Sequence, residues 1–186
     1  MFTILDIDQD FLWAVKPNYQ EIVTKDAFYR KYNIRDLLER YEAYGKPAKI
    51  FIQHFEVLEY MRYKNYKDVQ LIHLDRHDDL DRETYQSYNK PLLENGNWVS
   101  HAIRDGLLHS MDWISHSCPM PQYIHKEPNG ACCPISTHTL DSHDWKGRIS
   151  EVYFTVSPGF CKNDNSLLEF LRLTNPECYR EDWRFI

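Results

Sequence analysis

Three side chains able to bind a metal ion follow a short apolar segment in the middle of the chain. Residues 69–74 are mostly apolar and lead directly into Asp75, and His77 and Asp79 follow at alternate positions. This pattern is typical of a buried parallel strand whose carboxyl end lies at a functional site. If the chain stays extended, the three side chains point to one side. Carboxylate oxygens and imidazole nitrogens bind divalent metals, so the spacing predicts a metal site.

A second apolar segment, at the start of the chain, also ends in carboxylates. Residues 2–5 are followed by Asp6, Asp8 and Asp10, which share one face if the strand continues. Like charges placed so closely repel one another, and a cation is the simplest reason to gather them. From the sequence alone, the ligand pair at this strand end is either Asp6 and Asp8 or Asp8 and Asp10.

A third candidate ligand comes from the polar segment 52–56, which closes a strand predicted to begin at Ala48. His54 and Glu56 lie two residues apart and share a side if the chain remains extended there. A histidine at a strand end often makes a structural hydrogen bond instead of binding a metal. Its position at a third polar strand end makes His54 a candidate ligand.

The elements that position these residues alternate between strands and helices. Asn33 caps a helix whose apolar face runs from Ile34 to Tyr41 and which ends at Gly45 and Pro47, and Asn97 caps another. Further helices are expected over 57–66 and 165–171, and strands over 111–114 and 149–156. The segment 116–146 shows little periodicity. Its His138, Asp141 and His143 either lie in a solvated loop, which is the favoured interpretation, or bind a ligand. The pattern predicts a single domain, 1–186, with a three-layer α/β/α architecture, a mainly parallel sheet and its site at the carboxyl edge of the strands.

Composition limits the classes of partner. The chain has 186 residues, is 42% hydrophobic and carries a formal charge of −6, which argues against a nucleic-acid partner and favours a cationic substrate. No signal-peptide pattern or membrane-spanning apolar run is present in the sequence, so a cytoplasmic protein without a membrane partner is expected. Its 5 cysteines lack a repeated Cys-x-x-Cys spacing, which predicts reduced thiols.

The candidate ligands are too many for one tetrahedral zinc ion. They fit a pair of divalent ions that share bridging carboxylates, and mixed oxygen and nitrogen ligands favour Mn²⁺ or a similar ion. Two ions about 3.5–4 Å apart can hold a bridging hydroxide as the nucleophile. Four carboxylates and one hydroxide nearly cancel two dications, and the small remaining negative charge favours a cationic group. The predicted ligand set is Asp6, Asp8, His54, Asp75, His77 and Asp79.

These motifs resemble those of the arginase and agmatinase ureohydrolases. The run from Asp75 to Asp79 matches their Asp-x-His-x-Asp signature, and Leu5 to Asp8 is similar to their Asp-x-Asp strand end. The segment 95–100 is similar to their Gly-Asn segment, and 154–158 to their late strand ending in Asn-Pro. The nearest resemblance is to a small family that includes peptide arginases, which convert arginine side chains of ribosomally made precursor peptides to ornithine.

The resemblance implies an arginase- or deacetylase-like fold and a role for each candidate residue. A hydroxide bridging the ions attacks the guanidinium carbon, and collapse of the tetrahedral intermediate releases urea and leaves an amine. Glu56 or Asp10 holds the guanidinium by a bidentate hydrogen bond, and His101 carries a proton to the departing amine. In the implied ligation, Asp75 and Asp6 bridge the ions, Asp79 and His54 complete one shell, and His77 and Asp8 complete the other.

Departures from the arginase pattern bear on the substrate. The Asp-x-Asp strand comes first in this chain, and Trp98 and Val99 stand where a histidine is expected after Asn97. Asp81 occupies the place of an asparagine that reads the carboxylate of free arginine. A carboxylate at this position repels that group, which favours an arginine already held in a peptide. Asp81 and Asn97 are therefore the predicted substrate-binding residues.

Other functions also fit the sequence. They include another binuclear C–N hydrolase of the agmatinase or deacetylase type, a metal-dependent phosphoesterase, and a non-catalytic peptide-binding module. The phosphoesterase is disfavoured because no glycine-rich phosphate cradle or Lys/Arg cluster accompanies the motifs. The sequence permits a homo-oligomer and specifies no peptide motif.

Overall fold

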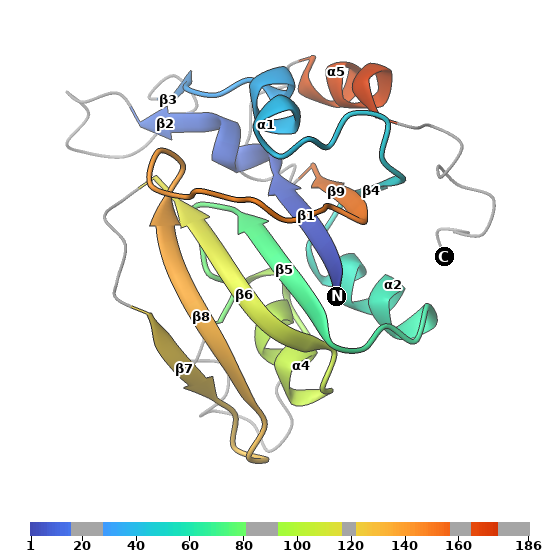
Figure 1. Ribbon diagram of the computed structural model, residues 1–186, viewed down its shortest axis with the longest axis vertical. Coiled ribbons are helices and arrows are strands. Elements are labelled where there is room, and N and C mark those ends of the chain that lie inside the picture. Colours follow the sequence, from blue (N-terminus) through green and yellow to red (C-terminus); the bar gives the residue numbers. More distant parts are fainter. Residues whose placement is uncertain (16–27, 81–92, 117–121, 157–164, 175–186) are drawn as a thin grey trace.

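The computed structural model describes residues 1–15, 28–80, 93–116, 122–156 and 165–174. It has an α/β architecture in which a seven-stranded, mostly parallel sheet is flanked by helices (Figure 1). The sheet order is β4-β9-β1-β5-β6-β8-β7, and only β7 runs antiparallel to its neighbour. Its strands are β1 (Phe2–Asp8), β4 (Ala48–Phe51), β5 (Val69–Leu74), β6 (Leu108–Ser115), β7 (Tyr123–Lys126), β8 (Cys132–Thr139) and β9 (Glu151–Thr155).

Short elements complete the described chain. A second sheet pairs β2 (Trp13–Val15) with β3 (Phe28–Arg30) in antiparallel fashion. The helices are η1 (Gln9–Leu12), α1 (Ile34–Arg40), α2 (Phe55–Tyr63), η3 (Asn95–Asn97), α4 (Trp98–Arg104) and α5 (Ser166–Leu173). In the described part of the chain, no helix has the length and apolar character needed to cross a membrane.

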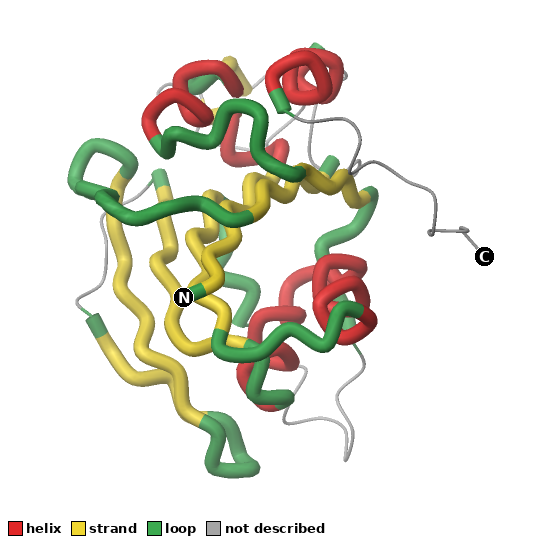
Figure 2. Tube along the Cα trace, turned by 45° about the vertical axis from the view of Figure 1, so that its right-hand side comes forward, coloured by secondary structure: helices red, strands yellow, loops and turns green. Residues whose placement is uncertain are grey.

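Helices cover both faces of the large sheet, as Figure 2 shows. One hydrophobic core joins α2 and α4 to one face, and the other core joins α1 and α5 to the opposite face. Alternate residues of β1 divide between them, since Ile4 belongs to the first core and Leu5 and Ile7 to the second. The predicted layering, with a mainly parallel sheet between helices, therefore agrees with the structure.

The strands that carry the predicted metal ligands lie at the centre of the sheet. β1 pairs with β5 on one side and with β9 on the other. Leu71, Ile72 and Leu74 of β5 are fully buried, and each contributes about 1.5–3 kcal/mol through the hydrophobic effect. Two well-packed neighbouring strands therefore fix the positions of the residues at their carboxyl ends.

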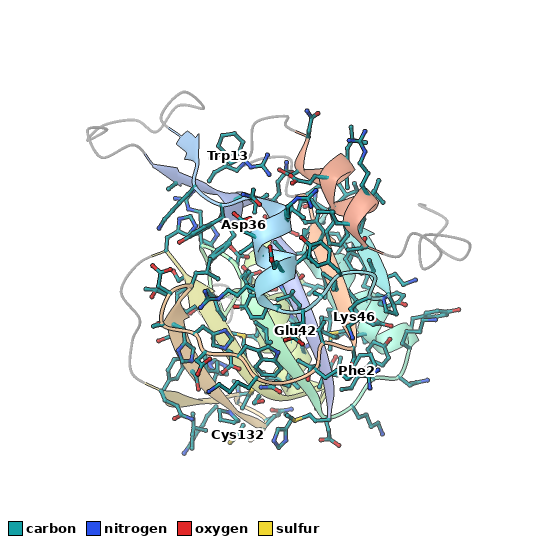
Figure 3. The ribbon with its side chains drawn as sticks, turned by 45° about the horizontal axis from the view of Figure 1, so that its top comes forward. Phe2, Trp13, Asp36, Glu42, Lys46 and Cys132 are labelled. Atoms are coloured by element: carbon teal, nitrogen blue, oxygen red, sulfur yellow. The ribbon has the colours of Figure 1, made fainter. Side chains whose placement is uncertain are left out.

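The direction of the parallel strands defines the two ends of the molecule. Phe2 and Cys132, at the starts of β1 and β8, lie at one end, and Trp13, shortly after β1, lies at the other (Figure 3). In Figure 1 the arrowheads of β1, β5, β6 and β8 point to the same end. The carboxyl edge of the sheet is therefore common to these strands, as the sequence predicts.

The start of α1 follows the prediction closely. The side chain of Asn33 accepts a hydrogen bond of 2.9 Å from the backbone N–H of Asp36. Ile34, Leu37 and Leu38 are buried, as the apolar spacing indicates. The predicted end at Gly45 and Pro47 is wrong, because α1 ends at Arg40 and a turn follows.

The prediction of an irregular loop over 116–146 is also wrong, because β7 and β8 lie within it. On β8, Cys133, Ile135 and Thr137 are buried at alternate positions. Pro134 disfavours a strand in the sequence. In the structure it lies outside the ladder with β6, which begins at Ile135. Its missing N–H therefore costs no hydrogen bond to β6.

Candidate metal centre

The carboxyl ends of β1 and β5 meet at one place because the two strands are parallel neighbours. Their register sets Asp6 of β1 directly beside His73 of β5. Asp8 closes β1, and Asp75 follows the last residue of β5. The three carboxylates and the imidazole are all buried. The predicted convergence of strand-end residues is thus present in the structure.

All three aspartates of the first motif belong to the cluster. The extended alternation ends at Asp8, whose Oδ1 accepts a hydrogen bond of 2.8 Å from the backbone N–H of Asp10 and caps η1. This turn brings Asp10 back beside the second motif, where its Oδ2 lies 3.5 Å from Nδ1 of His77. The choice between Asp6/Asp8 and Asp8/Asp10 is therefore not exclusive.

The second motif reaches the cluster through a turn and not through an extended chain. The Oδ1 of Asp75 accepts a hydrogen bond of 2.9 Å from the backbone N–H of His77. Asp79 has a φ of 52°, a left-handed conformation that aspartate tolerates better than most residues. The expected alternation past Leu74 is wrong, yet the turn still brings these residues together. His77 remains the outermost, with a side chain 55% exposed.

His54 enters the cluster from a helix start. The predicted extended chain over 52–56 is wrong, because His54 has helical φ and ψ angles and occupies the N-cap position of α2. Its Nδ1 lies 3.1 Å from Oδ2 of Asp8, 3.1 Å from Oδ2 of Asp79 and 3.3 Å from Oδ2 of Asp75. Its Nε2 lies 3.5 Å from Oδ2 of Asp6. The imidazole thus lies among four carboxylates.

His73 belongs to the cluster, although the sequence analysis did not select it. Its Nδ1 lies 2.8 Å from Oδ2 of Asp6, and its Nε2 lies 3.4 Å from Oδ2 of Asp75 and 3.7 Å from Oδ2 of Asp79. A signal was present in the sequence. His73 is a histidine inside a mostly apolar strand and lies two residues before Asp75, which places both on one face.

Trp98 contacts the cluster from outside the set of candidate ligands. It stands where the arginase pattern has a histidine. Its indole N–H donates a hydrogen bond of 2.6 Å to Oδ2 of Asp79. Its ring lies 5.8 Å from the ring of His54 and 5.7 Å from that of His73, centroid to centroid. Outer partners of this kind orient metal-binding side chains.

Several buried polar atoms of the cluster have no hydrogen-bond partner among the described residues. Such atoms are costly unless a cation or another partner satisfies them. Overlapping groups of three ligand atoms, each within 4.8 Å of one another, run through the whole cluster. These buried aspartates and histidines can therefore hold a metal ion. The atoms without a partner are Oδ1 of Asp6, Oδ1 of Asp10, Oδ2 of Asp75, Nε2 of His54 and Nε2 of His73.

The electrostatics of the cluster are divided between the two strand ends. Burial, followed by the charges of Asp8, Asp79 and Asp10, raises the pKa of Asp75 well above its usual range. Burial also acts to raise the pKa of Asp6, but His54 and His73 overcome it and lower that pKa to about 2. A bound divalent cation would favour the ionised form of Asp75, so metal binding and proton release are coupled here.

Both buried histidines tend toward the protonated form. Burial lowers the pKa of His54, but the carboxylates of Asp8, Asp6 and Asp79 raise it well above its usual value. Burial likewise lowers the pKa of His73, and the hydrogen bond to Asp6 outweighs this effect and raises it. Because a metal binds the neutral imidazole, an ion at this site must displace these protons.

A cavity of about 150 Å³ opens beside the cluster. Among the described residues, no lysine or arginine lines it. At roughly 30 Å³ per water molecule, it has room for about five waters. Its size suits ions and the end of one side chain. The lining residues are Asp8, Asp10, His54, Asp75, His77, Asp79, Asn95 and Gly96.

Three predicted functional residues lie outside the cluster. The carboxylate of Glu56 accepts hydrogen bonds from the backbone N–H groups of Ile52 and Gln53, at 2.8 and 3.1 Å. His101 lies on α4 beside Arg104, and burial and that arginine lower its pKa. Asn97 is buried, and its side chain accepts a hydrogen bond of 2.8 Å from the backbone N–H of Glu94. This hydrogen bond stabilises η3. The Asn97 side chain also does not cap α4. The fourth, Asp81, lies outside the described residues.

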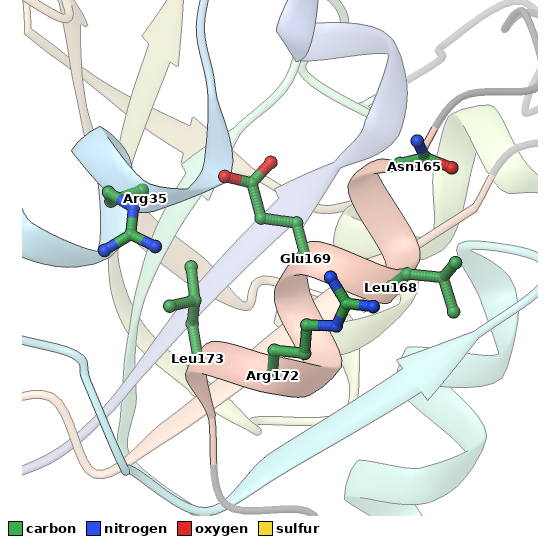
Figure 4. A pocket seen from close by; sticks show the side chains of 6 residues that line it. All are labelled: Arg35, Asn165, Leu168, Glu169, Arg172 and Leu173. Carbon is green, nitrogen blue, oxygen red and sulfur yellow. The ribbon is translucent and has the colours of Figure 1, made fainter.

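A larger cavity of about 350 Å³ lies elsewhere, between α1 and α5. Arg35 of α1 faces α5 across it, with Glu169 and Arg172 on the α5 side (Figure 4). Glu169 already accepts a hydrogen bond of 2.9 Å from Arg30. This cavity contains no group of potential metal ligands among the described residues, so the carboxylate cluster beside the smaller cavity remains the candidate site.

Comparisons with protein-family models, with curated proteins and with solved structures each found no match. The resemblance to the ureohydrolases therefore depends on the motifs quoted from the sequence, and the geometry of the site is the independent observation.

Proposed function

We propose that this protein is a peptide arginase, which hydrolyses the guanidinium group of arginine side chains in a peptide to urea and ornithine. One observation carries the proposal: the cavity is lined by four carboxylates, and no described lysine or arginine lies on its wall. Such a site attracts a cation and repels a phosphate. The proposed fold relationship is to the arginase and deacetylase class, with which the parallel sheet and its carboxyl-edge site are compatible.

The proposed cofactor is a pair of Mn²⁺ ions. Carboxylates outnumber imidazoles in the cluster, and such a donor set suits Mn²⁺ better than a thiolate-preferring metal. The buried atoms of the cluster that have no hydrogen-bond partner among the described residues fit bound cations. They are carboxylate oxygens and the Nε2 atoms of the two buried histidines, all of which are atom types that bind metals. When bound, the ions supply an activated water at neutral pH and polarise the guanidinium. The proposed ligands are Asp6, Asp8, His54, Asp75 and Asp79, with His73 added by the geometry, while His77 is proposed for proton transfer.

Asp10 is the residue proposed to bind the substrate guanidinium. It lines the cavity, is only 2% exposed, and its Oδ1 has no hydrogen-bond partner among the described residues. A carboxylate and a guanidinium form two parallel charge-assisted hydrogen bonds, which also fix the plane of the substrate. Glu56 is not proposed for this role, because its carboxylate is held by the start of α2.

His77 takes the proton-transfer role in this proposal, in place of His101. Its side chain is 55% exposed, lines the cavity and lies 3.4 Å from Oδ1 of Asp75. An imidazole that reaches both solvent and the reacting group can carry a proton to the departing amine. His101 lies among Arg104, Arg62 and Asp105 and is not a lining residue.

The preference for a peptide substrate is proposed from the charge that follows the second motif. The cavity of about 150 Å³ admits the guanidinium end of an arginine side chain in either form of the substrate. Asp81 follows directly after Leu80 at the end of the second motif, and its charge disfavours a free carboxylate.

The proposal is tested by incubating the Mn²⁺-loaded protein with an arginine-containing peptide and, separately, with free arginine. We expect urea from the peptide and loss of one cyanamide unit from its mass, with at least tenfold less urea from free arginine. Asp10→Asn should raise KM more than it lowers kcat, because it weakens binding of the guanidinium. A protein that loads metal but releases no urea from either substrate contradicts the proposal. A preference for free arginine would indicate an ordinary arginase.

A further inference from the structure

A second group of potential metal ligands lies on the opposite face of the sheet. Asp112 of β6, His138 of β8 and His143 in the turn after β8 each offer one ligand atom, and these atoms lie within 4.8 Å of one another. Asp112 shares its face with Ile114, which packs in the core with α1 and α5. The carboxylate cluster lies on the other face, because Asp6 shares its face of β1 with Ile4, which belongs to the first core. The two groups are therefore separate.

We propose that Asp112, His138 and His143 bind one Zn²⁺ ion, independently of the carboxylate cluster and of the activity proposed for it. The sequence favours a solvated loop for the segment that contains both histidines, with ligand binding as the alternative. In the structure, β8 and the turn that follows bring both histidines over β6, and His143 is 5% exposed.

The ring of His143 is oriented by a partner outside the group. Its Nδ1 lies 2.9 Å from the hydroxyl of Tyr41 on the turn after α1, and its backbone carbonyl accepts a hydrogen bond of 2.8 Å from Arg40. Its Nε2 consequently faces Asp112, at 3.7 Å from Oδ2. Metal-binding histidines commonly use one ring nitrogen for such an outer hydrogen bond and the other for the ion.

The other two ligands are positioned by the sheet. β6 and β8 are parallel neighbours with Ile114 beside His138, which sets the histidine one alternate position from Asp112 along the ladder. The Nε2 of Gln70 on β5 donates a hydrogen bond of 3.2 Å to Oδ2 of Asp112. The rings of His138 and His143 lie 4.8 Å apart, centroid to centroid. Backbone and side-chain contacts thus hold the group before an ion binds.

The separations suit an ion better than direct hydrogen bonds. The 3.7 Å between His143 and Asp112 is too long for a hydrogen bond. With zinc to ligand distances of about 2.0–2.2 Å, two ligands of a tetrahedral ion lie roughly 3.3–3.6 Å apart. Small side-chain rotations therefore suffice to close the site around Zn²⁺. Two imidazoles and one carboxylate are a donor set that zinc accepts, with water completing the shell.

The ion would fasten the turn after β8 to the sheet. Trp145 lies against His143 with stacked rings 6.2 Å apart, so the turn already packs over the site. Binding to the folded form and not to the unfolded chain stabilises the protein by mass action. The proposed ion therefore stabilises the folded chain, on the face of the sheet away from the cavity.

The test measures Zn²⁺ binding to the full chain, with Zn²⁺ and the spectroscopic probe Co²⁺ as ligands. The metal-free wild type is compared with His138→Gln and Asp112→Asn, and with His109→Gln as the control. His109 is an exposed histidine on the same strand as Asp112. We expect His138→Gln and Asp112→Asn to lose one equivalent of bound Zn²⁺ and the visible Co²⁺ bands of a tetrahedral site. His109→Gln should keep both.

Tyr41→Phe provides a second, finer variant. It leaves the ligands in place and removes the hydroxyl that orients His143, so we expect Zn²⁺ to bind 10–100-fold more weakly, in the range typical of outer partners. Far-UV circular dichroism and unchanged Mn²⁺ binding verify that each variant folds. If folded Asp112→Asn and His138→Gln bind as much Zn²⁺ as the wild type, with the same Co²⁺ spectrum, the proposal is overturned.

Discussion

The two groups of aspartate and histidine on opposite faces of the sheet use the same residue types in different ways. At the carboxyl edge, five aspartates and two histidines are at least nine-tenths buried, and several of their atoms have no hydrogen-bond partner among the described residues. Across the sheet, one partly exposed aspartate and two histidines are held by Tyr41 and Gln70.

The difference between the two groups shows how the number of buried carboxylates determines the need for a compensating cation. A few imidazoles with one carboxylate can form a stable hydrogen-bonded network, and an ion adds to it. Many buried carboxylates repel one another, as the raised pKa of Asp75 indicates, and a cation or bound protons must compensate them. We therefore propose hard divalent ions at the first group, where the proposed hydrolysis takes place, and a single zinc ion at the second.

The largest expected effect is that of Asp75→Asn. Asp75 lies within 3.4 Å of His54, His73 and His77, so its loss removes a shared ligand. Metal activation of water is worth several kcal/mol, and we expect urea release to fall by about 10³-fold or more. The matched control is Asp68→Asn at an exposed position with a φ of 53°, which should retain activity. Substantial activity in Asp75→Asn would contradict the assignment of the site.

Trp98→Phe should have a smaller effect on the same group. The substitution keeps an aromatic ring in the buried position but removes the N–H that donates to Asp79. We expect Mn²⁺ affinity to fall 10–100-fold, while Zn²⁺ binding at the second group is unchanged. Calorimetric titration of both ions measures the two effects side by side. Equal weakening at both groups would mean that Trp98 acts through the whole fold.

The metal-free protein should lose stability as the pH rises above about 6.5. The pKa values of His54 and His73 are raised in the folded state above their usual value of 6.5. Their contribution is fully present below that value and is lost as the pH rises through the folded pKa values. The raised pKa of Asp75 acts in the same direction. Saturating Mn²⁺ should reverse the trend, because metal binding favours the deprotonated ligands.

Thermal unfolding between about pH 6.5 and about pH 9, with and without Mn²⁺, checks this prediction. His116 does not interfere in this window. Burial lowers its pKa to about 4, so its contribution changes only below 6.5. His54→Gln should flatten the metal-free profile. A metal-free protein whose Tm rises across this window would show that the buried histidines are not held in the protonated form.

The smallest effect is expected at a position remote from both groups. Asn33→Ala removes the side-chain cap of α1 and should lower the free energy of unfolding by about 1 kcal/mol. Chemical denaturation measures the loss, and Asn33→Ser, which keeps a capping oxygen, should restore most of it. Mn²⁺ and Zn²⁺ binding should remain at wild-type values. A change in either would mean that the stability of α1 is coupled to the groups.

The sequence predicted the parts of the fold that follow from local pattern. The range of β5 and the start of β4 agree with the structure, as does the cap of α1, because hydrophobic spacing and a capping side chain are properties of neighbouring residues. The loop prediction over 116–146 failed because the partners of β8 are distant in sequence. Pairing with β6 and β7, and not local propensity, determines that this segment is extended.

The candidate site was predicted in composition more fully than in geometry. Asp6, Asp8 and Asp75 were selected because apolar strands deliver them. The predicted backbone conformation at Asp79 and His54 was wrong, because a left-handed turn and a helix start replace the extended chain that was expected there. His73 was missed because its role depends on the register between β1 and β5, which sets it beside Asp6. No pattern within a single segment reveals that register.

The most direct test of the central claim is the number of Mn²⁺ ions bound per chain at the carboxyl edge. Elemental analysis of the Mn²⁺-dialysed protein, after removal of excess metal, should give two ions for the wild type and for His138→Gln, and at most one for Asp75→Asn. No bound Mn²⁺ in the folded wild type, or an unchanged count in Asp75→Asn, would contradict the metal centre and the hydrolysis proposed to depend on it.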